Sequence, residues 1–177
     1  MSKQINVGLI GFGIGGQIFH APFITSVKDF ALKKIRSTNA AQVALAHAQY
    51  PLAEVVPDAQ NIINDPAIEL VVITTPNTLH YPLAKAALLA GKHVVLDKPF
   101  TIDTKEADEL ISLAAEQNLL LTVYHSRRLD SDFQTVKKLI ESGVLGDVVE
   151  FESHFDRFRN FLKPNAWRED AVPGAGI

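Results

Sequence analysis

Three glycines near the start of the chain have the spacing of a nucleotide-binding loop. They form a G-x-G-x-x-G pattern that directly follows the apolar run 5–10. In such a pattern the first glycine permits a tight turn, the second lets a pyrophosphate approach the backbone, and the third lets a helix pack closely on the strand. The N–H groups at the start of that helix would bind the phosphates. The pattern predicts a dinucleotide-binding loop made of Gly11, Phe12, Gly13, Ile14, Gly15 and Gly16.

The residues at the end of the next apolar run bear on which dinucleotide is bound. In NAD-binding domains, an acidic residue about 20 positions past the glycines accepts hydrogen bonds from the ribose 2′-hydroxyl. Residues 33–39 here are Lys-Lys-Ile-Arg-Ser-Thr-Asn and contain no acid. Arg36, Ser37 and Thr38 could instead receive a 2′-phosphate, although the same residue types also suit an ordinary solvent-exposed strand end. The stretch favours NADP(H), with NAD(H) as the alternative. The glycine loop alone would also fit FAD or S-adenosylmethionine.

Short apolar runs alternate with helical patterns along the first two thirds of the chain. This alternation is typical of a parallel sheet with crossover helices. Most of the runs are apolar on both faces, as a sheet covered on both sides requires. The predicted strands are 5–10, 30–36, 54–56, 70–74, 93–96 and 119–124. The predicted fold class is therefore α/β, a doubly wound parallel sheet of the NAD(P)-binding Rossmann type, over residues 1–125.

Two helices between these strands have clear boundaries. Asp103 and Glu106 have the spacing of a capping box, and they precede an apolar stripe at positions 107, 110, 111, 114 and 115. Thr78 predicts the start of a helix that runs to residue 90, where Gly91 can supply the left-handed end.

The pattern changes after residue 125. Asp130 and Gly143 bracket a helix, and its inward-facing residues would be Phe133, Val136, Leu139 and Ile140. Residues 147–157 then alternate between apolar and charged, which predicts a strand of an open, antiparallel sheet. A single strand cannot form a stable sheet. Residues 126–177 are therefore interpreted as the start of an incomplete α+β domain.

Composition limits the possible partners. Seventeen Lys and Arg against 20 Asp and Glu give a net charge of -3, so the chain lacks the basic surface that nucleic acid or an anionic membrane requires. The run 5–10 is too short for a signal peptide or a membrane span. The absence of Cys excludes disulfides, thiol catalysis and cysteine-bound metals, and no metal site is predicted. We expect a cytoplasmic protein that acts on a small molecule.

Several motifs occur together in a specific order. They are Gly11–Gly16 with His20 and Pro22, Thr75-Pro76-Asn77 with His80, Ala90-Gly91-Lys92-His93-Val94, and Asp97-Lys98-Pro99. This combination resembles the Gfo/Idh/MocA oxidoreductase family, and the resemblance covers nearly all of the chain. The later segments 125–128 and 155–159 are similar to a bacterial branch of NADP-linked reductases. The resemblance implies nicotinamide-dependent hydride transfer to or from a sugar, a polyol or a related alcohol or carbonyl compound.

The resemblance places Lys98 at the catalytic lysine of the family, in a motif more often written Glu-Lys-Pro. Lys98 would act as general acid or base for the substrate oxygen. Its expected place is the carboxyl end of a strand, where doubly wound sheets bind ligands, and Pro99 would restrict its backbone. A lone lysine without these neighbours would be interpreted as a surface residue. The resemblance further implies contacts with the cofactor from Thr74, Thr75, Pro76, Asn77, His80, Asp97, Lys98, Pro99 and His125.

Several of these side chains have alternative roles. His80 could equally cap or pack a helix, and Arg127 and Arg128 suit structural ion pairs as well as an anionic substrate group. Family members are about twice as long as this chain, and their second half supplies an Asp and a His and commonly a dimer interface. The chain is then either half of such an oxidoreductase, inactive alone, or a non-catalytic NAD(P)-binding module. The lysine favours the first hypothesis, and a homo-oligomer is expected.

Overall fold

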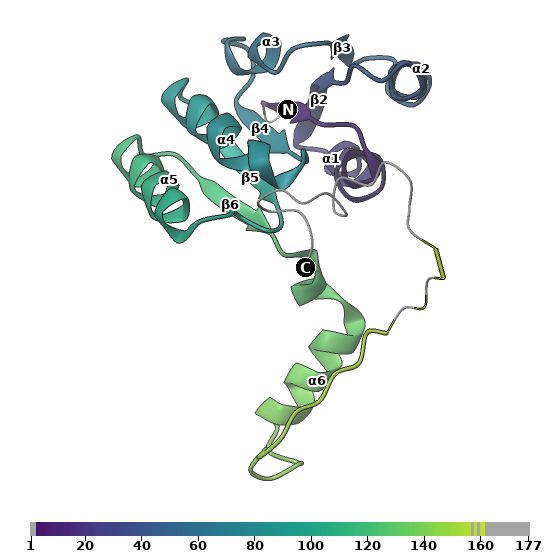
Figure 1. Cartoon of the computed structure of the whole chain (residues 1–177), viewed down its shortest axis with the longest axis vertical. Coiled ribbons are helices and arrows are strands. Elements are labelled where there is room, and N and C mark those ends of the chain that lie inside the picture. Colours follow the sequence, from purple (N-terminus) through teal and green to yellow (C-terminus); the bar gives the residue numbers. More distant parts are fainter. Residues whose placement is uncertain (1–2, 157, 159, 162–177) are drawn as a thin grey trace.

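A computed structural model describes residues 3–156, 158, 160 and 161 (Figure 1). Its centre is a six-stranded, fully parallel sheet with the order β3-β2-β1-β4-β5-β6. The strands are β1 (Ile5–Ile10), β2 (Phe30–Arg36), β3 (Glu54–Val56), β4 (Leu70–Ile73), β5 (His93–Asp97) and β6 (Leu121–Tyr124). This is the strand order of the dinucleotide-binding doubly wound fold, in which ligands bind where the order reverses, between β1 and β4.

Helices cover both faces of the sheet, as the doubly apolar strands predict. One face packs against α1 (Ala21–Ser26) and α2 (Ala40–Gln49), and the other packs against α3 (Gln60–Ile63), α4 (His80–Leu89) and α5 (Thr104–Glu116). Strand β4 contributes to both cores, because Val71 and Ile73 join the cluster under α3–α5 while Val72 joins the cluster under α1 and α2. The prediction of a doubly wound Rossmann sheet is confirmed.

The predicted element boundaries agree with the structure to within two residues for the strands. As predicted, helix α5 begins after Asp103, whose side chain accepts a 2.7 Å hydrogen bond from the Lys105 backbone N–H. Gly91, which follows α4, has a φ of 74° and so adopts the left-handed conformation predicted for a helix end. The predicted helix start at Thr78 is wrong. Residues Asn77–Leu79 form a 3₁₀ turn without a side-chain cap, and α4 begins at His80.

No helix among the described residues is long and apolar enough to span a bilayer.

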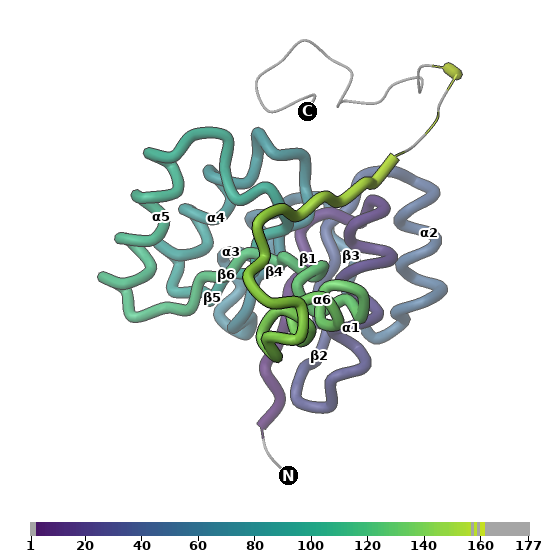
Figure 2. The backbone as a smooth tube through the Cα atoms, turned by 90° about the horizontal axis from the view of Figure 1, so that it is seen from below, coloured from purple at the N-terminus to yellow at the C-terminus, as the bar shows by residue number. Residues whose placement is uncertain are grey.

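The segment after β6 leaves the sheet. A 3₁₀ turn (Ser126–Leu129) leads into α6 (Ser131–Glu141), which projects away from the rest of the molecule in Figure 1 and is seen nearly end-on in Figure 2. The predicted inward face of this helix is therefore not buried: Phe133, Leu139 and Ile140 are 45%, 43% and 43% exposed, and Val136 is half-buried. An apolar stripe is buried only where a second element covers it, and no described element covers this one.

The strand predicted for residues 147–157 is also not formed in the described part of the chain. Residues 147–156 have no regular structure, and Val149 is 96% exposed. A strand needs a neighbour to pair with, and no other segment within residues 3–156 pairs with this one. Arg157 and the glycine-containing stretch 173–177 lie outside the described residues.

Candidate active site

The glycine loop has the geometry that a pyrophosphate site needs. Gly11 has a φ of 106°, and a Cβ there would lie 2.9 Å from the Thr74 carbonyl oxygen. A Cβ on Gly16 would lie 2.3 Å from the Gly11 carbonyl oxygen, so the third glycine is required for close packing. A Cβ on Gly13 would meet no atom of the chain within 4 Å. The space beside Gly13 therefore fits an approaching phosphate group.

The loop after β4 is tied to the glycine loop across the point where the strand order reverses. The Thr74 hydroxyl donates a 2.7 Å hydrogen bond to the Gly11 carbonyl, and the Thr74 N–H donates to the Ile10 carbonyl at 2.9 Å. Thr75 follows with a buried hydroxyl that has no hydrogen-bond partner among the described residues. Thr74, Thr75, Pro76 and Asn77 thus stand at the edge of the sheet where the cofactor was predicted.

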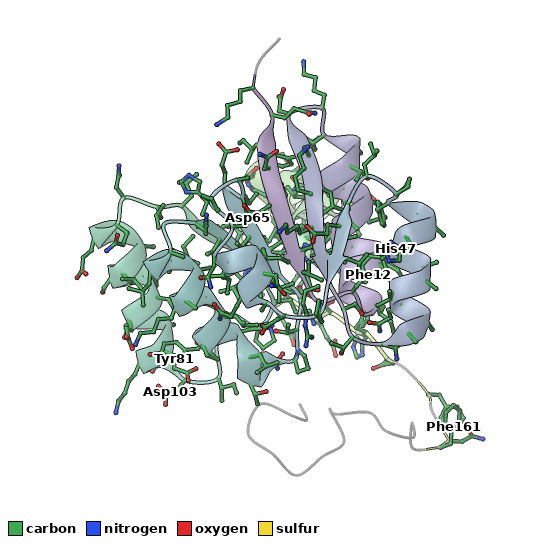
Figure 3. The ribbon with its side chains drawn as sticks, turned by 90° about the horizontal axis from the view of Figure 1, so that it is seen from above. Phe12, His47, Asp65, Tyr81, Asp103 and Phe161 are labelled. Atoms are coloured by element: carbon green, nitrogen blue, oxygen red, sulfur yellow. The ribbon has the colours of Figure 1, made fainter. Side chains whose placement is uncertain are left out.

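The residues that separate the glycines are not equivalent. Phe12 is 1% exposed, and its ring meets Tyr50 edge-on at a centroid distance of 6.0 Å, between the sheet and α2 (Figure 3). Its carbonyl accepts a 2.7 Å hydrogen bond from the Gln17 side chain, which helps to fix the loop. Ile14 is 62% exposed. Phe12 can therefore offer a ligand only its backbone, whereas Ile14 can offer its side chain.

The end of β2 carries the groups predicted for the 2′-phosphate. The Arg36 Nε–H donates to the Pro57 carbonyl at 3.1 Å, and Thr38 is exposed. Ser37 is buried, and its hydroxyl donates to the Gln42 side chain at 2.9 Å. The Ser37 hydroxyl is thus already used within the fold, so Arg36 and Thr38 are the better placed pair for an anion.

Lys98 stands at the carboxyl end of β5 with an exposed side chain, and the peptide bond between Lys98 and Pro99 is cis. Its backbone N–H donates a 2.8 Å hydrogen bond to Oδ1 of Asp97. The other oxygen, Oδ2, lies 3.2 Å from the position of a Cβ on Gly15. Burial would raise the pKa of the Asp97 carboxyl, but the His20 ring and the Lys98 N–H outweigh burial and lower it. Asp97 is therefore ionised at neutral pH, accepts a hydrogen bond from the Lys98 backbone, and lies close to Gly15 of the glycine loop.

His80 joins the loops after β4 and β5. Its ring is fully buried, with Nδ1 2.8 Å from the Pro99 carbonyl oxygen and Nε2 3.0 Å from the Thr75 carbonyl oxygen. The enclosed ring holds these loops in place and presents no surface of its own. His125, by contrast, is exposed just after β6.

Two arginines, Arg127 and Arg128, follow β6 in the 3₁₀ turn. Arg127 forms a 2.7 Å ion pair with Asp130, and its guanidinium lies 5.5 Å from the centre of the Phe155 ring. This is the structural ion pair that was considered as the alternative to an anion site. Arg128 is exposed.

Sequence reasoning missed two residues beside Asp97, which precedes Lys98 in the chain. His20, at the end of the π-helical turn Gly15–His20, is 4% exposed, and its ring lies 4.4 Å from that of Tyr124. Tyr124 is the register partner of Asp97 in the β5–β6 pair. Burial raises the pKa of the Tyr124 hydroxyl, and the nearby carboxylates of Asp97 and Asp130 raise it further. His20 was noticed only as part of a motif, and the Tyr124 pairing depends on strand register.

Together these residues provide backbone N–H donors, an arginine and an amine at one edge of the sheet. This arrangement can bind a dinucleotide phosphate and can exchange a proton beside it. Fold and site together define an NAD(P)-binding Rossmann domain.

Comparison with known proteins places this domain in a family. Residues 5–125 match the family model described as the oxidoreductase family, NAD-binding Rossmann fold, and residues 133–177 match the GFO/IDH/MocA C-terminal domain. The chain belongs to the Gfo/Idh/MocA oxidoreductase family, as the motif resemblance predicted. A nicotinamide cofactor is therefore favoured over FAD or S-adenosylmethionine.

Individual relatives are similar over almost the whole chain. The oxidoreductase YdgJ of Escherichia coli is 50% identical over 177 residues, which are 100% of this chain and 50% of that protein. The scyllo-inositol 2-dehydrogenase (NADP(+)) IolW of Bacillus subtilis is 42% identical over 97% of this chain and 47% of its own length. The solved structure of the oxidoreductase YPO2259 from Yersinia pestis is 49% identical, with a TM-score of 0.87 over 96% of this chain and 47% of that one. The chain spans about half the length of the curated relatives it matches.

Proposed function

We propose that this chain is the cofactor-binding half of an NADP(H)-preferring oxidoreductase that acts on a CH–OH group or the corresponding carbonyl of a sugar, polyol or related small molecule. The observation that carries this proposal is the position of Lys98, whose side chain is exposed and whose backbone is hydrogen-bonded to Asp97, a residue that lies close to Gly15 of the glycine loop. A domain that only binds a nucleotide has no need of an amine there. The relatives support the proposal, since IolW is named as an NADP(+)-dependent dehydrogenase of an inositol.

Each part of the site has a task in this proposal. The N–H groups of the glycine loop bind the pyrophosphate, and the open side of Gly13 admits it. Arg36 and Thr38 contact the ribose 2′-phosphate. The nicotinamide, when bound, accepts or donates the hydride. Lys98 donates a proton to the substrate oxygen during reduction and removes it during oxidation.

The first test of the proposal is cofactor binding by the 177-residue chain. Fluorescence titration with NADPH and NADH should show binding of both, with NADPH the tighter ligand. Absence of binding by a folded chain would overturn the proposal, and tighter binding of NADH would overturn the NADP(H) preference.

The second test concerns Lys98 and uses the full-length protein. Lys98→Ala should reduce kcat by about 100-fold or more, since general acid–base groups contribute that much, while the Kd for NADPH changes little. Lys105→Ala is the matched control, because Lys105 is exposed in the first turn of α5 and lies outside the site. Turnover by Lys98→Ala equal to that of the control would refute the catalytic role.

A further inference from the structure

The proposed reaction does not use the ionisable side chains beside Lys98 at the carboxyl ends of β5 and β6. Among them His20 is unusual. Its Nε2 is buried, has no hydrogen-bond partner among the described residues, and lies 3.9 Å from Oδ2 of Asp97. A buried polar atom without a partner destabilises a fold. An apolar side chain could pack on Tyr124 at this position without burying an unpaired nitrogen. The presence of an imidazole here therefore suggests a role other than packing.

The sheet register explains how His20 and Asp97 come to face each other. Asp97 and Tyr124 are directly paired in β5 and β6, so both side chains project from the same face of the sheet. His20 reaches this face from the end of the turn that follows the glycine loop, and its ring rests on the ring of Tyr124 at an interplanar angle of 49°. The Tyr124 ring therefore supports the imidazole beside the carboxylate.

The two oxygens of the Asp97 carboxylate have different neighbours. Oδ1 accepts the hydrogen bond of the Lys98 backbone N–H at 2.8 Å, and Oδ2 faces Nε2 of His20. Rotation of the carboxylate would break the contact with Lys98. A group that fixes Oδ2 therefore also fixes the backbone from which the Lys98 side chain extends.

We propose that His20 is a positioning residue of the Lys98 site, acting through the Asp97 carboxylate that its ring faces. The proposal rests on the proposed function of Lys98. His20 itself is nine-tenths buried and acts without touching the reacting atoms.

The charged groups around Asp97 allow the contribution of His20 to be measured. His20 faces the carboxylate from the π-helical turn, Lys98 from the position after β5, and Tyr124 from β6. Asp130 also acts on the Tyr124 hydroxyl. Burial acts to raise the pKa of the Asp97 carboxyl, whereas His20 and Lys98 act to lower it. Removal of the imidazole should therefore raise this pKa.

The test variant is His20→Phe in the 177-residue chain, which keeps an aromatic ring on Tyr124 and removes Nε2. Carboxyl ¹³C NMR follows the titration of Asp97, assigned with Asp97→Asn. The His20 ring acts to lower the pKa of the Asp97 carboxyl, so we expect the titration midpoint of Asp97 to move upward in His20→Phe. His47→Phe, at an exposed position of α2, is the matched control and should leave the midpoint unchanged. An unchanged midpoint in His20→Phe would overturn the proposal.

A second measurement serves if His20→Phe does not fold. Asp97→Asn should then move the ¹⁵N resonance of the His20 Nε2 in the otherwise native chain. A resonance that stays in place would show that the two side chains are not coupled, which also overturns the proposal.

Activity distinguishes a positioning role from a structural one. In the full-length protein, His20→Phe should lower kcat about 10-fold through misplacement of Lys98, with little change in the Kd for NADPH. His20→Gln, whose side-chain amide supplies an N–H donor in place of the ring N–H, should recover part of the loss. Equal activity of His20→Phe and wild type would overturn the positioning role. If instead Lys98→Ala retained full turnover, the proposed function would fail, while the NMR coupling of His20 and Asp97 would be unaffected.

Discussion

Gly13 separates binding of the cofactor from folding of the loop. A Cβ at this position would meet no atom of the chain within 4 Å, and the residue lacks the positive φ that makes Gly11 irreplaceable. The change Gly13→Ala should therefore leave the fold intact. Loss of glycine flexibility in the unfolded chain could even stabilise the protein by up to about 1 kcal/mol. The methyl group would instead occupy the space through which a pyrophosphate reaches the loop.

The loss of affinity follows from the hydrogen bonds that the displaced phosphate gives up. A hydrogen bond to a charged group contributes about 1.5–3 kcal/mol. Loss of one such bond weakens binding by about 10- to 150-fold. We expect fluorescence titration of Gly13→Ala with NADPH to show a Kd raised by about that factor, with the urea midpoint of unfolding unchanged or slightly raised.

Gly16→Ala is the contrasting variant. Its Cβ would lie 2.3 Å from the Gly11 carbonyl oxygen, so the helix must move away from the loop and the protein should lose stability. Wild-type affinity for NADPH in a folded Gly13→Ala chain would refute the assignment of the open side of Gly13 to the pyrophosphate. Equal destabilisation by the two variants would refute the packing argument.

Three further predictions concern other parts of the molecule. Arg36→Glu should weaken NADPH binding by about 100-fold through loss of a charged hydrogen bond and affect NADH much less; an equal loss for both cofactors in the same titration would contradict the role of Arg36. The folded-state pKa of Asp97 lies below its ordinary value of 3.8, so its contribution to stability is present at neutral pH and is lost as the pH falls through the folded value. The free energy of unfolding of wild type, measured with urea, should therefore approach that of Asp97→Asn as the pH is lowered from about 7 to about 3. A difference that stays constant over this range would contradict the stabilising role of the Asp97 carboxylate. The apolar residues exposed along 147–156, of which Val149 is 96% and Phe155 70% exposed, should make the chain self-associate, so a strictly monomeric chain in concentrated light-scattering samples would contradict this expectation.

Apolar runs were sufficient to predict the sheet because its strands are covered on both faces. A run such as Leu70–Ile73 must be apolar at every position, and the glycines that follow β1 mark the loop beside it. Thr74 and Lys98 follow strand ends, but only the family resemblance assigned them to the site, because a lysine at a strand end would by itself be interpreted as a surface residue. In this part of the chain, the apolar pattern of a segment is enough to predict whether the segment is a strand of the sheet.

The remainder depends on contacts between distant segments. The helix after β6 has a regular apolar stripe, yet Phe133 is 45% exposed because burial requires a partner that the stripe does not encode. The contact between His20 and Asp97 depends on the β5–β6 register and on where the first helical turn ends. Ser37 was predicted at the cofactor, but its hydroxyl is bonded to Gln42, a pairing that no spacing rule indicates.

The ties between the loops have a consequence for how a ligand associates with this protein. Thr74 joins the loops after β1 and β4, and His80 joins the loops after β4 and β5. The rim of the sheet is thus braced before any ligand arrives, and little conformational entropy remains to be lost on binding. We therefore expect cofactor association to proceed at the rate of diffusional encounter, with no slow phase from loop ordering in stopped-flow traces.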